Sequence, residues 1–304
     1  MFKRVGVLGH PLRPITAEVC SEVAQTVRQR GAEAWCYTTW GAAEIRPQVA
    51  ESDLIIAIGG DGSMLRAARL AAQYDVPVFG INAGHLGFLT ESSLSEWDQA
   101  LERLFSGMYW IETRMMIRAE TWRNDSRLLV ENALNDVVVS RGGASRSILV
   151  ETYIDGGWTT TYNADGVIIA TPTGSTAYAL AVGGPILPPE LANILVIPVA
   201  PHLSLDRPLV LAKGAVVELR IPDETMSEAM LTVDGENLNP LRSGDSIVVQ
   251  GSEHRARFVR LRERHYFYRS LLDRLEPHEP SRRARQPYQP RRARLDALAE
   301  DMPS

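Results

Sequence analysis

The first 112 residues alternate between short apolar runs and longer segments whose apolar positions follow the helical period. Strands are predicted at 5–10, 32–39, 54–60 and 76–82, and helices at 16–30 and 63–75. The run LIIAIGG at 54–60 is apolar almost throughout, as in parallel strands that are buried on both faces. Strands that alternate with helices predict an open, mostly parallel α/β sheet.

After Met115 the pattern changes to apolar runs separated by turns, with little helix. Such runs occur in 116–123, 126–141, 147–158, 166–172, 194–201, 215–222, 229–236 and 245–261. We therefore expect an α/β domain over residues 1–115 and an all-β domain over residues 116–264. The segment from Pro277 to Ser304 holds six arginines and few apolar residues, which is typical of a flexible tail. Its arginine clusters could touch anionic surfaces, but a solvated tail is the favoured interpretation.

Composition narrows the class of protein. The 304 residues are 45% hydrophobic and 23% charged, with a net charge of −5 and a pI near 5.8. This balance argues against a nucleic-acid-binding protein. Cys20 and Cys36 are too few for a zinc site, and we expect them to be reduced thiols in a cytoplasm. No run has the ~18 apolar residues of a membrane span, so we expect no membrane partner.

A glycine-rich stretch, Gly59-Gly60-Asp61-Gly62-Ser63, follows the predicted strand at 54–60 and begins the next helix. Glycines let the backbone approach a ligand closely, and free amides at a helix start form an anion site. The stretch is not a Walker loop, because no lysine follows the glycines. The alternative is that Asp61 only caps the helix, which would leave the surrounding glycines unexplained.

Two more polar loops follow predicted strands. The loop in 80–91 carries three glycines with Asn82 and His85, although a tight turn would explain the glycines equally well. In 162–189 a strand runs into Pro172-Thr173-Gly174-Ser175-Thr176, with Tyr178 close behind. Hydroxyls, backbone amides and one aromatic ring suit a polar, planar ligand such as a nucleotide base. A hydroxyl-rich turn without a ligand is the alternative.

Read together, these stretches resemble one family, the NAD kinases. The resemblance rests on GGDGS (59–63), N-x-G-x-L-G-F-L (82–89), ALNDVV (133–138), DGVIIATPTGSTAY (165–178), GGPI (183–186), P-H-x-x-x-x-R-P (201–208) and VDGE (233–236). These motifs occur in order over about residues 1–275. The family's fold, an α/β domain followed by a β-rich domain with the ligand between them, agrees with the prediction above. It also implies that the segment 265–276 returns to pack on the N-terminal domain.

The reaction implied by the resemblance is transfer of the γ-phosphoryl group of ATP to the 2′-hydroxyl of the adenosine ribose of NAD. Asp61 would hydrogen-bond that hydroxyl and accept its proton, late in the reaction because a carboxylate is a far weaker base than an alkoxide. The implied donor-phosphate ligands are Gly59, Gly60, Gly62, Ser63 and Arg66. Mg²⁺ or another divalent cation would be carried by the nucleotide, within reach of Asp61 and with no dedicated protein cage.

The resemblance also implies a set of positions in contact with NAD. They are Asp61, Gly62, Asn82, Asn135, Asp136, Arg146, Asn163, Asp165, Thr173, Gly174, Ser175, Thr176, Ala177, Tyr178, His202 and Glu236. For Arg146 a solvated arginine is an equal alternative. Three positions depart from the family pattern: Ser63 replaces the usual threonine, Glu236 replaces a common glutamine, and Asn163 stands where some members carry a basic residue.

Other functions remain open at this point. A GGDG kinase of a lipid or sugar phosphate would share the glycine loop but would not explain the run that ends at Tyr178. A non-catalytic dinucleotide sensor would have no need of Asp61. A dehydrogenase is disfavoured because no G-x-G-x-x-G follows an early strand. By analogy with the family we expect a homodimer or homotetramer, and the sequence leaves the choice of ATP or polyphosphate open.

Overall fold

The computed structural model describes residues 2–39, 44–84, 87–143, 147–223, 228–264 and 266–275. The chain divides into two compact units, Met1–Glu263 and Arg264–Ser304. The first unit holds both expected domains. In the second, the described element is helix α6 (Tyr266–Leu275). The predicted docking of 265–276 stays a prediction, and the tail at 277–304 lies outside the described residues.

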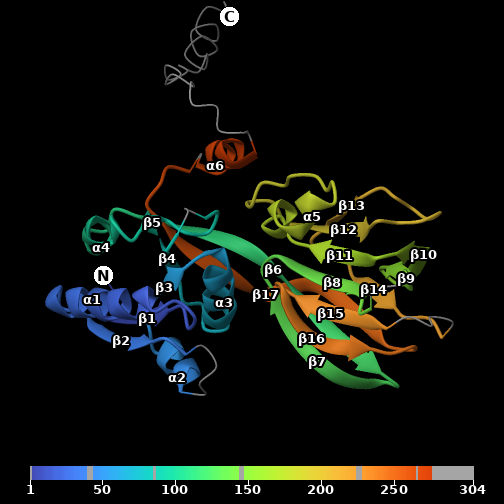
Figure 1. The fold of residues 1–304 in the computed structure, drawn as a ribbon, viewed down its shortest axis with the longest axis horizontal. Helices are drawn as coiled ribbons and strands as arrows, with labels where there is room; N and C mark the ends of the chain where they lie inside the picture. The colour runs from blue at the N-terminus through green and yellow to red at the C-terminus, as the bar shows by residue number, and fades with distance from the viewer. Residues whose placement is uncertain are drawn as a thin grey trace, which may run out of the picture. The chain divides into compact units, whose positions relative to one another are not determined.

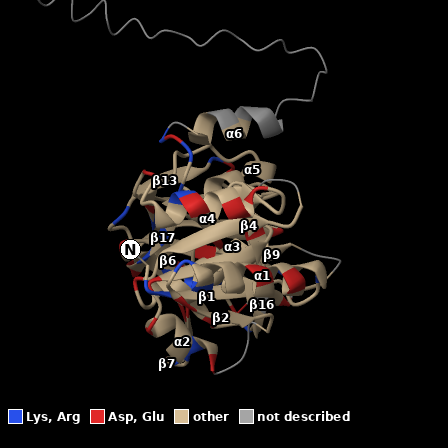
Figure 2. Ribbon diagram, turned by 90° about the vertical axis from the view of Figure 1, so that its left-hand side faces the viewer, with Lys and Arg blue, Asp and Glu red and all other residues tan. Residues whose placement is uncertain are grey.

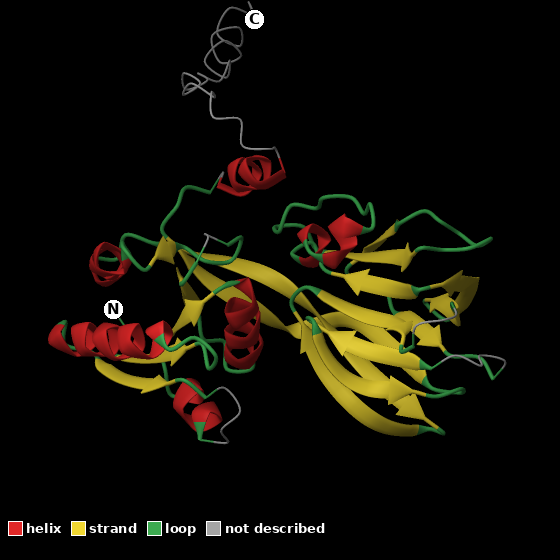
Figure 3. Cartoon of the chain, in the orientation of Figure 1, coloured by secondary structure: helices red, strands yellow, loops and turns green. Residues whose placement is uncertain are grey.

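Strands and helices alternate up to residue 105, after which strands dominate (Figures 1 and 3). The strands are β1 (Arg4–Gly9), β2 (Glu33–Tyr37), β3 (Leu54–Gly59), β4 (Val78–Asn82), β5 (Ser92–Ser93), β6 (Trp110–Arg123), β7 (Ser126–Ala133), β8 (Asp136–Arg141), β9 (Ile148–Ile154), β10 (Gly157–Ala164), β11 (Gly166–Ala170), β12 (Asn193–Val199), β13 (Leu209–Ala212), β14 (Val217–Arg220), β15 (Ala229–Val233), β16 (Glu236–Leu241) and β17 (Ser246–Arg260). The helices of the first unit are α1 (Ile15–Gln29), α2 (Ile45–Ala50), α3 (Asp61–Ala72), α4 (Trp97–Phe105) and α5 (Tyr178–Ala181), with a 3₁₀ turn at Gly174–Thr176.

The N-terminal strands form the predicted parallel sheet, in the order β2-β1-β3-β4. Apolar side chains of β1 and β3 point to both faces. One face is covered by α1 and α4, and the other by α2 and α3. A strand buried on both faces has no polar side to alternate with, which explains the continuous apolar run at 54–60.

Strand β17 connects the two parts of the first unit. Near its end it pairs in parallel with β4, through Phe258 and Val78. Along most of its length it pairs antiparallel with β6. A sheet of eleven strands therefore runs from the α/β part into the β-rich part. A second, antiparallel sheet has the order β13-β12-β11-β8-β15-β16, and the main apolar core lies between the two sheets.

The predicted fold class is confirmed, because every predicted strand and both predicted helices are present. Helices α2 and α4 were not among the predicted elements. The first has only six residues and contains Pro47, while the second has nine. Such short helices offer few turns over which an apolar period can be recognised.

The expectation of two reduced thiols is wrong for this structure, which joins Cys20 and Cys36 in a disulfide. The fold explains why they meet. Cys20 lies on the face of α1 that covers β1, and Cys36 lies on β2 beside Val7 of β1. Their Cα atoms are 6.2 Å apart, which is within the range of a disulfide.

Among the described residues, no helix is both long and apolar enough to cross a membrane. Lysine and arginine are interspersed with aspartate and glutamate along the elements in view in Figure 2. This mixture fits the modest net charge of the sequence.

Candidate active site

The glycine loop and the loop after β4 start at the same edge of the parallel sheet. Gly59 at the end of β3 pairs in register with Asn82 at the end of β4. The amide of Ala83 donates to the carbonyl of Gly59 at 2.9 Å. Carboxyl ends of neighbouring parallel strands are the usual place for a ligand in an open α/β sheet. The two loops predicted to bind a nucleotide are therefore adjacent.

Helix α3 begins at Asp61, and Gly60 precedes it in an extended conformation. A Cβ atom at Gly60 or Gly62 would enter open space, and neither residue has a positive φ. Neither packing among the described residues nor backbone strain therefore requires glycine there. A ligand lying against this backbone would require it, because free amides at a helix start attract anions. The amide of Ser63 already donates to the carbonyl of Gly60 at 3.0 Å.

The Asp61 carboxylate is held by the backbone of the second loop. Its Oδ2 accepts from the amide of Phe88 at 2.8 Å, and its Oδ1 from the amide of Leu89 at 3.1 Å. A Cβ atom at Gly87 would lie only 1.8 Å from Oδ1. Glycine at this position is what allows the loop to close over the carboxylate. Asp61 therefore has a fixed orientation that a simple helix cap does not require.

Asn82 and Ser63 are the polar side chains next to the Asp61 loop. The Asn82 side chain accepts from the amide of Gly84 at 2.7 Å and donates to Thr90 Oγ1 at 3.1 Å, which closes the loop on itself. Ser63 is buried, and its hydroxyl has no hydrogen-bond partner among the described residues. A buried hydroxyl left without a partner is costly, so Ser63 Oγ is a plausible ligand atom beside Gly59.

Further along α3, two arginines contact the hairpin between β15 and β16. Arg66 donates from Nε to Glu236 at 2.7 Å, and Arg69 lies 3.3 Å from the other oxygen of that carboxylate. Arg69 also pairs with Glu131 at 2.8 Å. Arg66 lies about 7.5 Å along the helix axis from Asp61. These ion pairs therefore hold the predicted phosphate ligand Arg66 next to the predicted NAD ligand Glu236.

A cavity of about 380 Å³ opens beside this hairpin. It is lined by Asn135, Asp136, Val138, Ser140, Ala177, Tyr178, Thr232, Asp234 and Gly235. Four of these residues are among the predicted NAD ligands. The volume is in the range of small-molecule sites, and Tyr178 is 45% exposed. The structure thus joins the ALNDVV and STAY motifs in one pocket, although they are far apart in sequence.

Asp234 shapes this pocket from the inside. Its Oδ1 accepts from the amides of Asn135 and Asp136 at 2.7 and 3.1 Å, and its Oδ2 from the amide of Leu134 at 2.9 Å. Asp234 has a φ of +48°, in the left-handed region that aspartate tolerates better than most residues. Burial raises the pKa of Asp234, while the three amides and Arg69 act in the opposite direction.

Asp136 is the titrating group of the pocket. Burial, and to a lesser degree the neighbouring Asp234 carboxylate, raise the pKa of Asp136 to about 7. Two carboxylates close together cannot both ionise easily in a site shielded from water. Asp136 therefore changes its charge near neutral pH, in the pocket that is predicted to hold the adenosine ribose.

The hydroxyls of the 171–176 turn are used largely to build the turn. Thr171 Oγ1 accepts from the amide of Gly174, Ser175 Oγ donates to Pro172, and Thr176 Oγ1 donates to Thr173. A Cβ at Gly174 would lie 2.0 Å from the carbonyl oxygen of Asn135. Ser175 is completely buried. The turn thus places Ala177 and Tyr178 against Asn135, while Ser175 and Thr176 act through its shape.

Three predicted NAD ligands form a separate group. The amide of His202 donates to the carbonyl of Asn163 at 2.7 Å, and Asp165 pairs with Arg141 at 3.1 Å. Asp165 precedes strand β11 and the 171–176 turn follows it, so six residues of strand, roughly 20 Å, separate Asp165 from that turn. The pocket itself extends along β8 to Ser140, whose strand partner Gly166 is the residue next to Asp165. The group therefore lies at the Ser140 end of the pocket, away from the turn. The remaining predicted ligand, Arg146, lies outside the described residues.

Two domain families match the chain: the ATP-NAD kinase N-terminal domain over residues 5–109 and the ATP-NAD kinase C-terminal domain over residues 134–261. The chain is 42% identical to an NAD kinase of Chloroflexus aurantiacus over 279 residues, covering 90% of this chain and 99% of that one. It is 40% identical to an NAD kinase of Heliobacterium modesticaldum, with 90% and 98% covered. This chain belongs to the ATP-NAD kinase family.

Solved structures agree with this assignment to the family. A yeast NADH kinase complexed with NADH superposes with a TM-score of 0.76 at 26% identity, covering 93% of this chain and 90% of that chain. An NAD kinase from Archaeoglobus fulgidus in complex with ATP superposes with a TM-score of 0.68 at 25% identity, covering 89% and 97%. The resemblance read from the motifs is confirmed. A lipid or sugar-phosphate kinase, and a non-catalytic sensor, are not supported.

In this kinase the sequence analysis missed Asp234 and Gly87 as contributors to the site. Asp234 belongs to the family motif VDGE and Gly87 to N-x-G-x-L-G-F-L, so the motifs could have pointed to both residues. Their partners, however, lie far away in sequence: Asp234 binds amides at 134–136, and Gly87 borders Asp61. A pattern along the chain does not show which distant backbone a residue touches.

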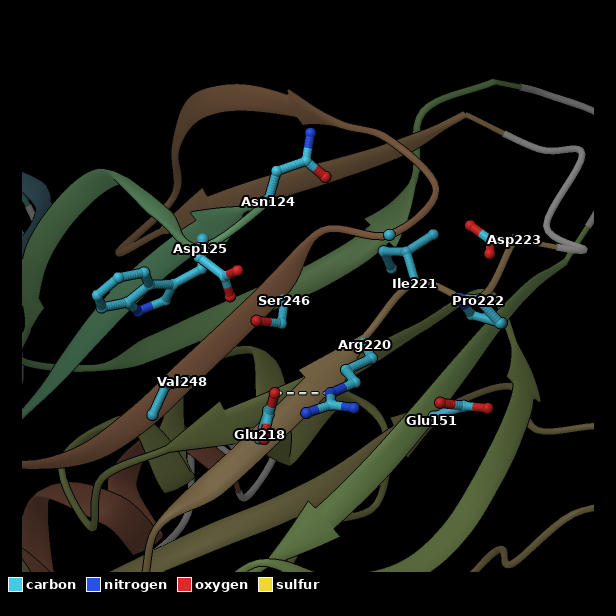
Figure 4. Close-up of a pocket in the computed structure, with 12 residues that line it drawn as sticks. Asn124, Asp125, Glu151, Glu218, Arg220, Ile221, Pro222, Asp223, Ser246 and Val248 are labelled. Carbon is cyan, nitrogen blue, oxygen red and sulfur yellow. Dashed lines mark hydrogen bonds and ion pairs between the residues drawn. The ribbon is translucent and has the colours of Figure 1, made fainter.

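The kinase also has a larger hollow, of about 540 Å³, that contains none of the predicted site residues. It lies over β14, β17 and β9 in the β-rich part of the first unit (Figure 4). Its basic residue, Arg220, already pairs with Glu218 at 2.7 Å, as the dashed line in Figure 4 marks. Size alone does not make it the substrate site, because the motif residues and the buried titrating carboxylate lie around the smaller pocket.

Proposed function

We propose that this kinase transfers the γ-phosphoryl group of ATP to the 2′-hydroxyl of the adenosine ribose of NAD, with Asp61 as the residue that orients the hydroxyl. The observation that carries the proposal is the fixed Asp61 carboxylate. Two amides hold it at the start of α3, beside glycines whose missing side chains leave room for a ligand. An oriented carboxylate next to an anion site is what phosphoryl transfer to a hydroxyl requires.

In this mechanism the 2′-oxygen attacks the γ-phosphorus, a new O–P bond forms, and the bond to the β-γ bridging oxygen breaks to release ADP. The Phe88 and Leu89 amides hold the Asp61 carboxylate, and in this orientation it would accept a hydrogen bond from the ribose hydroxyl. The hydroxyl proton passes to the carboxylate late, since a loose transition state needs little early proton removal.

The acceptor is proposed to lie in the 380 Å³ pocket, with its adenosine against Asn135, Asp136, Ala177 and Tyr178. Carboxylates commonly bind ribose hydroxyls in dinucleotide sites, and the exposed ring of Tyr178 offers an apolar surface to a base. The separate group of Asn163, Asp165 and His202 is proposed to contact the rest of the dinucleotide.

The donor phosphates are proposed to lie on Gly59, Gly60 and Gly62, within reach of Ser63 and Arg66. A divalent cation fits these residues, because Mg²⁺ is typically bound by one or two carboxylates together with substrate phosphates. Asp61 and the Ser63 hydroxyl would face it, and when bound it would neutralise charge on the phosphates. Among the described residues, no group of three or more His, Cys, Asp or Glu side chains could hold a metal.

We further propose that the enzyme is a homodimer or homotetramer. Analogy with the family supports this proposal. Light scattering of the purified protein tests the assembly, and a monomer with full activity would contradict it.

A cytoplasmic location and the absence of a nucleic-acid partner are also proposals. The net charge of −5 supports the second. The Cys20–Cys36 disulfide stands against the first, because cytoplasmic proteins rarely keep disulfides. Thiol labelling of protein quenched rapidly from cells tests this, since labelling of both cysteines indicates a reducing compartment.

The experiment that tests the function is incubation of the purified protein with ATP, Mg²⁺ and NAD, followed by an NADP-specific dehydrogenase assay. We expect NADP to form, and chelation of the metal to stop the reaction. An NAD analogue without the 2′-hydroxyl should compete with NAD and give no product. Parallel reactions with inorganic polyphosphate determine whether ATP is the only donor. No NADP above a control without enzyme would refute the proposal.

A further inference from the structure

Behind the Asp61 loop lies a chain of buried charged side chains that the reaction described so far does not use. Arg260 ends β17 and is completely buried, while Glu112 and Arg114 of β6 are 4% and 3% exposed. Arg260 donates from Nε to Glu112 Oε2 at 2.7 Å. Arg114 donates to the same oxygen at 3.1 Å. One carboxylate therefore joins two guanidinium groups in the interior.

One end of this chain reaches the loop that holds Asp61. Arg260 donates from Nη1 to the carbonyl oxygen of Leu89 at 2.9 Å. The amide of the same residue, Leu89, donates to Asp61 Oδ1 at 3.1 Å. The Leu89 amide and the Leu89 carbonyl belong to two rigid peptide planes that meet at the Leu89 Cα atom. A hydrogen bond that holds the carbonyl fixes one of these planes and with it the Cα atom, which limits where the amide on the other side of that atom can point.

The other end reaches the turn that shapes the dinucleotide pocket. Arg114 Nη1 lies 3.5 Å from Thr173 Oγ1. Both guanidinium groups lie over the ring of Phe258, at 5.0 Å for Arg260 and 5.3 Å for Arg114. Planar groups packed between a carboxylate and an aromatic ring have few alternative positions. The chain thus extends from the Asp61 loop to the 171–176 turn through rigid contacts.

Stability alone does not account for these charges. Removing charged groups from water is expensive, and apolar residues of similar volume often serve a core as well or better. Precise geometry is what a forked, multiply bonded arginine adds. We propose that Arg260 is a positioning residue for phosphoryl transfer, which acts through the backbone of Leu89 to hold the Asp61 carboxylate in its reactive orientation. This inference rests on the proposed role of Asp61.

The test begins with Arg260→Met, which keeps most of the side-chain volume. Arg260 pairs with two carboxylates, Glu112 at 2.7 Å and Glu91 at 3.5 Å. Neither loses its only partner in the variant, because Glu112 still pairs with Arg114 at 3.0 Å and Glu91 with Arg262 at 2.8 Å. We expect kcat to fall by roughly 10–100-fold, because small displacements of a reacting group slow a reaction by about this factor. The dissociation constant for NAD should change less than about threefold, because Arg260 lies outside the pocket.

A double mutant identifies the route of the effect. If Arg260 acts through Asp61, adding Arg260→Met to Asp61→Asn should not lower kcat any further. Long incubations that detect residual NADP formation measure kcat in the double variant. An equal loss of kcat in both backgrounds would overturn the inference, and so would an unchanged kcat in the single variant. If Arg260→Met does not fold, Arg260→Lys is judged by the same criteria, since one ammonium cannot span Glu112 and Leu89 in the same fork.

Arg123 provides the matched control. It pairs bidentately with the buried Asp245, at 2.7 Å for each bond, on the same strand β6. Eleven residues separate it from Glu112, roughly 35 Å along the strand. Arg123→Met should lower the melting temperature and leave kcat unchanged. A comparable fall in kcat here would mean that any loss of an ion pair on β6 slows the reaction, and would overturn the specific role of Arg260.

The outcomes separate this inference from the proposed function. If Asp61→Asn keeps normal turnover, the proposed role of Asp61 fails and Arg260 fails with it. If Asp61→Asn is strongly impaired and Arg260→Met is as active as wild type, the proposed function stands and only the positioning role is refuted.

Discussion

The glycines around Asp61 are there for two different physical reasons. At Gly59 a Cβ would lie 2.1 Å from Ser63 Oγ, and at Gly87 it would strike the Asp61 carboxylate. Those two glycines are required by the protein's own packing. At Gly60 and Gly62 a Cβ would meet no atom of the described residues, and a ligand that lies against the backbone accounts for both glycines. Of the three glycines in GGDG, packing therefore requires Gly59, and a ligand accounts for Gly60 and Gly62.

The Gly87 position offers a direct test. Gly87→Ala puts a methyl group where Asp61 Oδ1 lies, so we expect the carboxylate to turn and kcat to fall by roughly 100-fold. Gly84→Ala is the control in the same loop, since its Cβ would make only ordinary contacts at 3.6 Å. Initial rates of NADP formation measure both. Equal activity of the two variants would show that the orientation of Asp61 does not matter.

Asp136 predicts a pH dependence of NAD binding. Its pKa of about 7 lies above the ordinary 3.8, so stability contributed by the protonated form is lost as the pH rises through about 7. The ionised form accepts hydrogen bonds from ribose hydroxyls. Affinity for NAD should therefore rise up to about 10-fold between pH 6 and 8, measured by calorimetry without ATP. Asp136→Asn should remove this dependence, and a flat wild-type profile would contradict the assignment.

Helix α3 is the element that connects the Asp61 loop to the hairpin beside the pocket. It starts at Asp61, packs Met64 and Ala68 into the core below, and carries Arg66 and Arg69 to the hairpin beside the pocket. The strands and long helices of this region were predictable, because their apolar periods are strong. The contact between α3 and the hairpin was not, since Arg66 and Glu236 are 170 residues apart in sequence.

The Glu236 position predicts an effect on the donor. Glu236 neutralises Arg66, and both side chains are more than a third exposed. Glu236→Gln should free Arg66 for phosphate and lower KM for ATP by roughly 2–5-fold, with a change in unfolding free energy below about 1 kcal/mol. Glu131→Gln, which removes a partner of Arg69, is the matched control. A raised KM for ATP in Glu236→Gln would show that the pair positions Arg66 productively.

At the scale of the whole molecule, two domains share one sheet. The sequence shows a change from alternating strands and helices to strands near residue 115. It does not show that strand β6 crosses this boundary, or that β17 returns to pair with β4. The apolar pattern predicted the fold, and the motifs predicted the family and contain most of the residues that line the pocket. The motifs did not predict that Asn163, Asp165 and His202 lie at the opposite end of β11 from the 171–176 turn, because motifs carry no distances.

The central claim is that Asp61 orients the ribose hydroxyl for phosphoryl transfer. The most direct measurement compares NADP formation from ATP, Mg²⁺ and NAD by the wild-type enzyme and by Asp61→Asn, with NAD binding measured alongside by calorimetry. We expect Asp61→Asn to lose turnover on the order of 10²–10⁴ with NAD still bound. Near-normal turnover in Asp61→Asn would contradict the central claim.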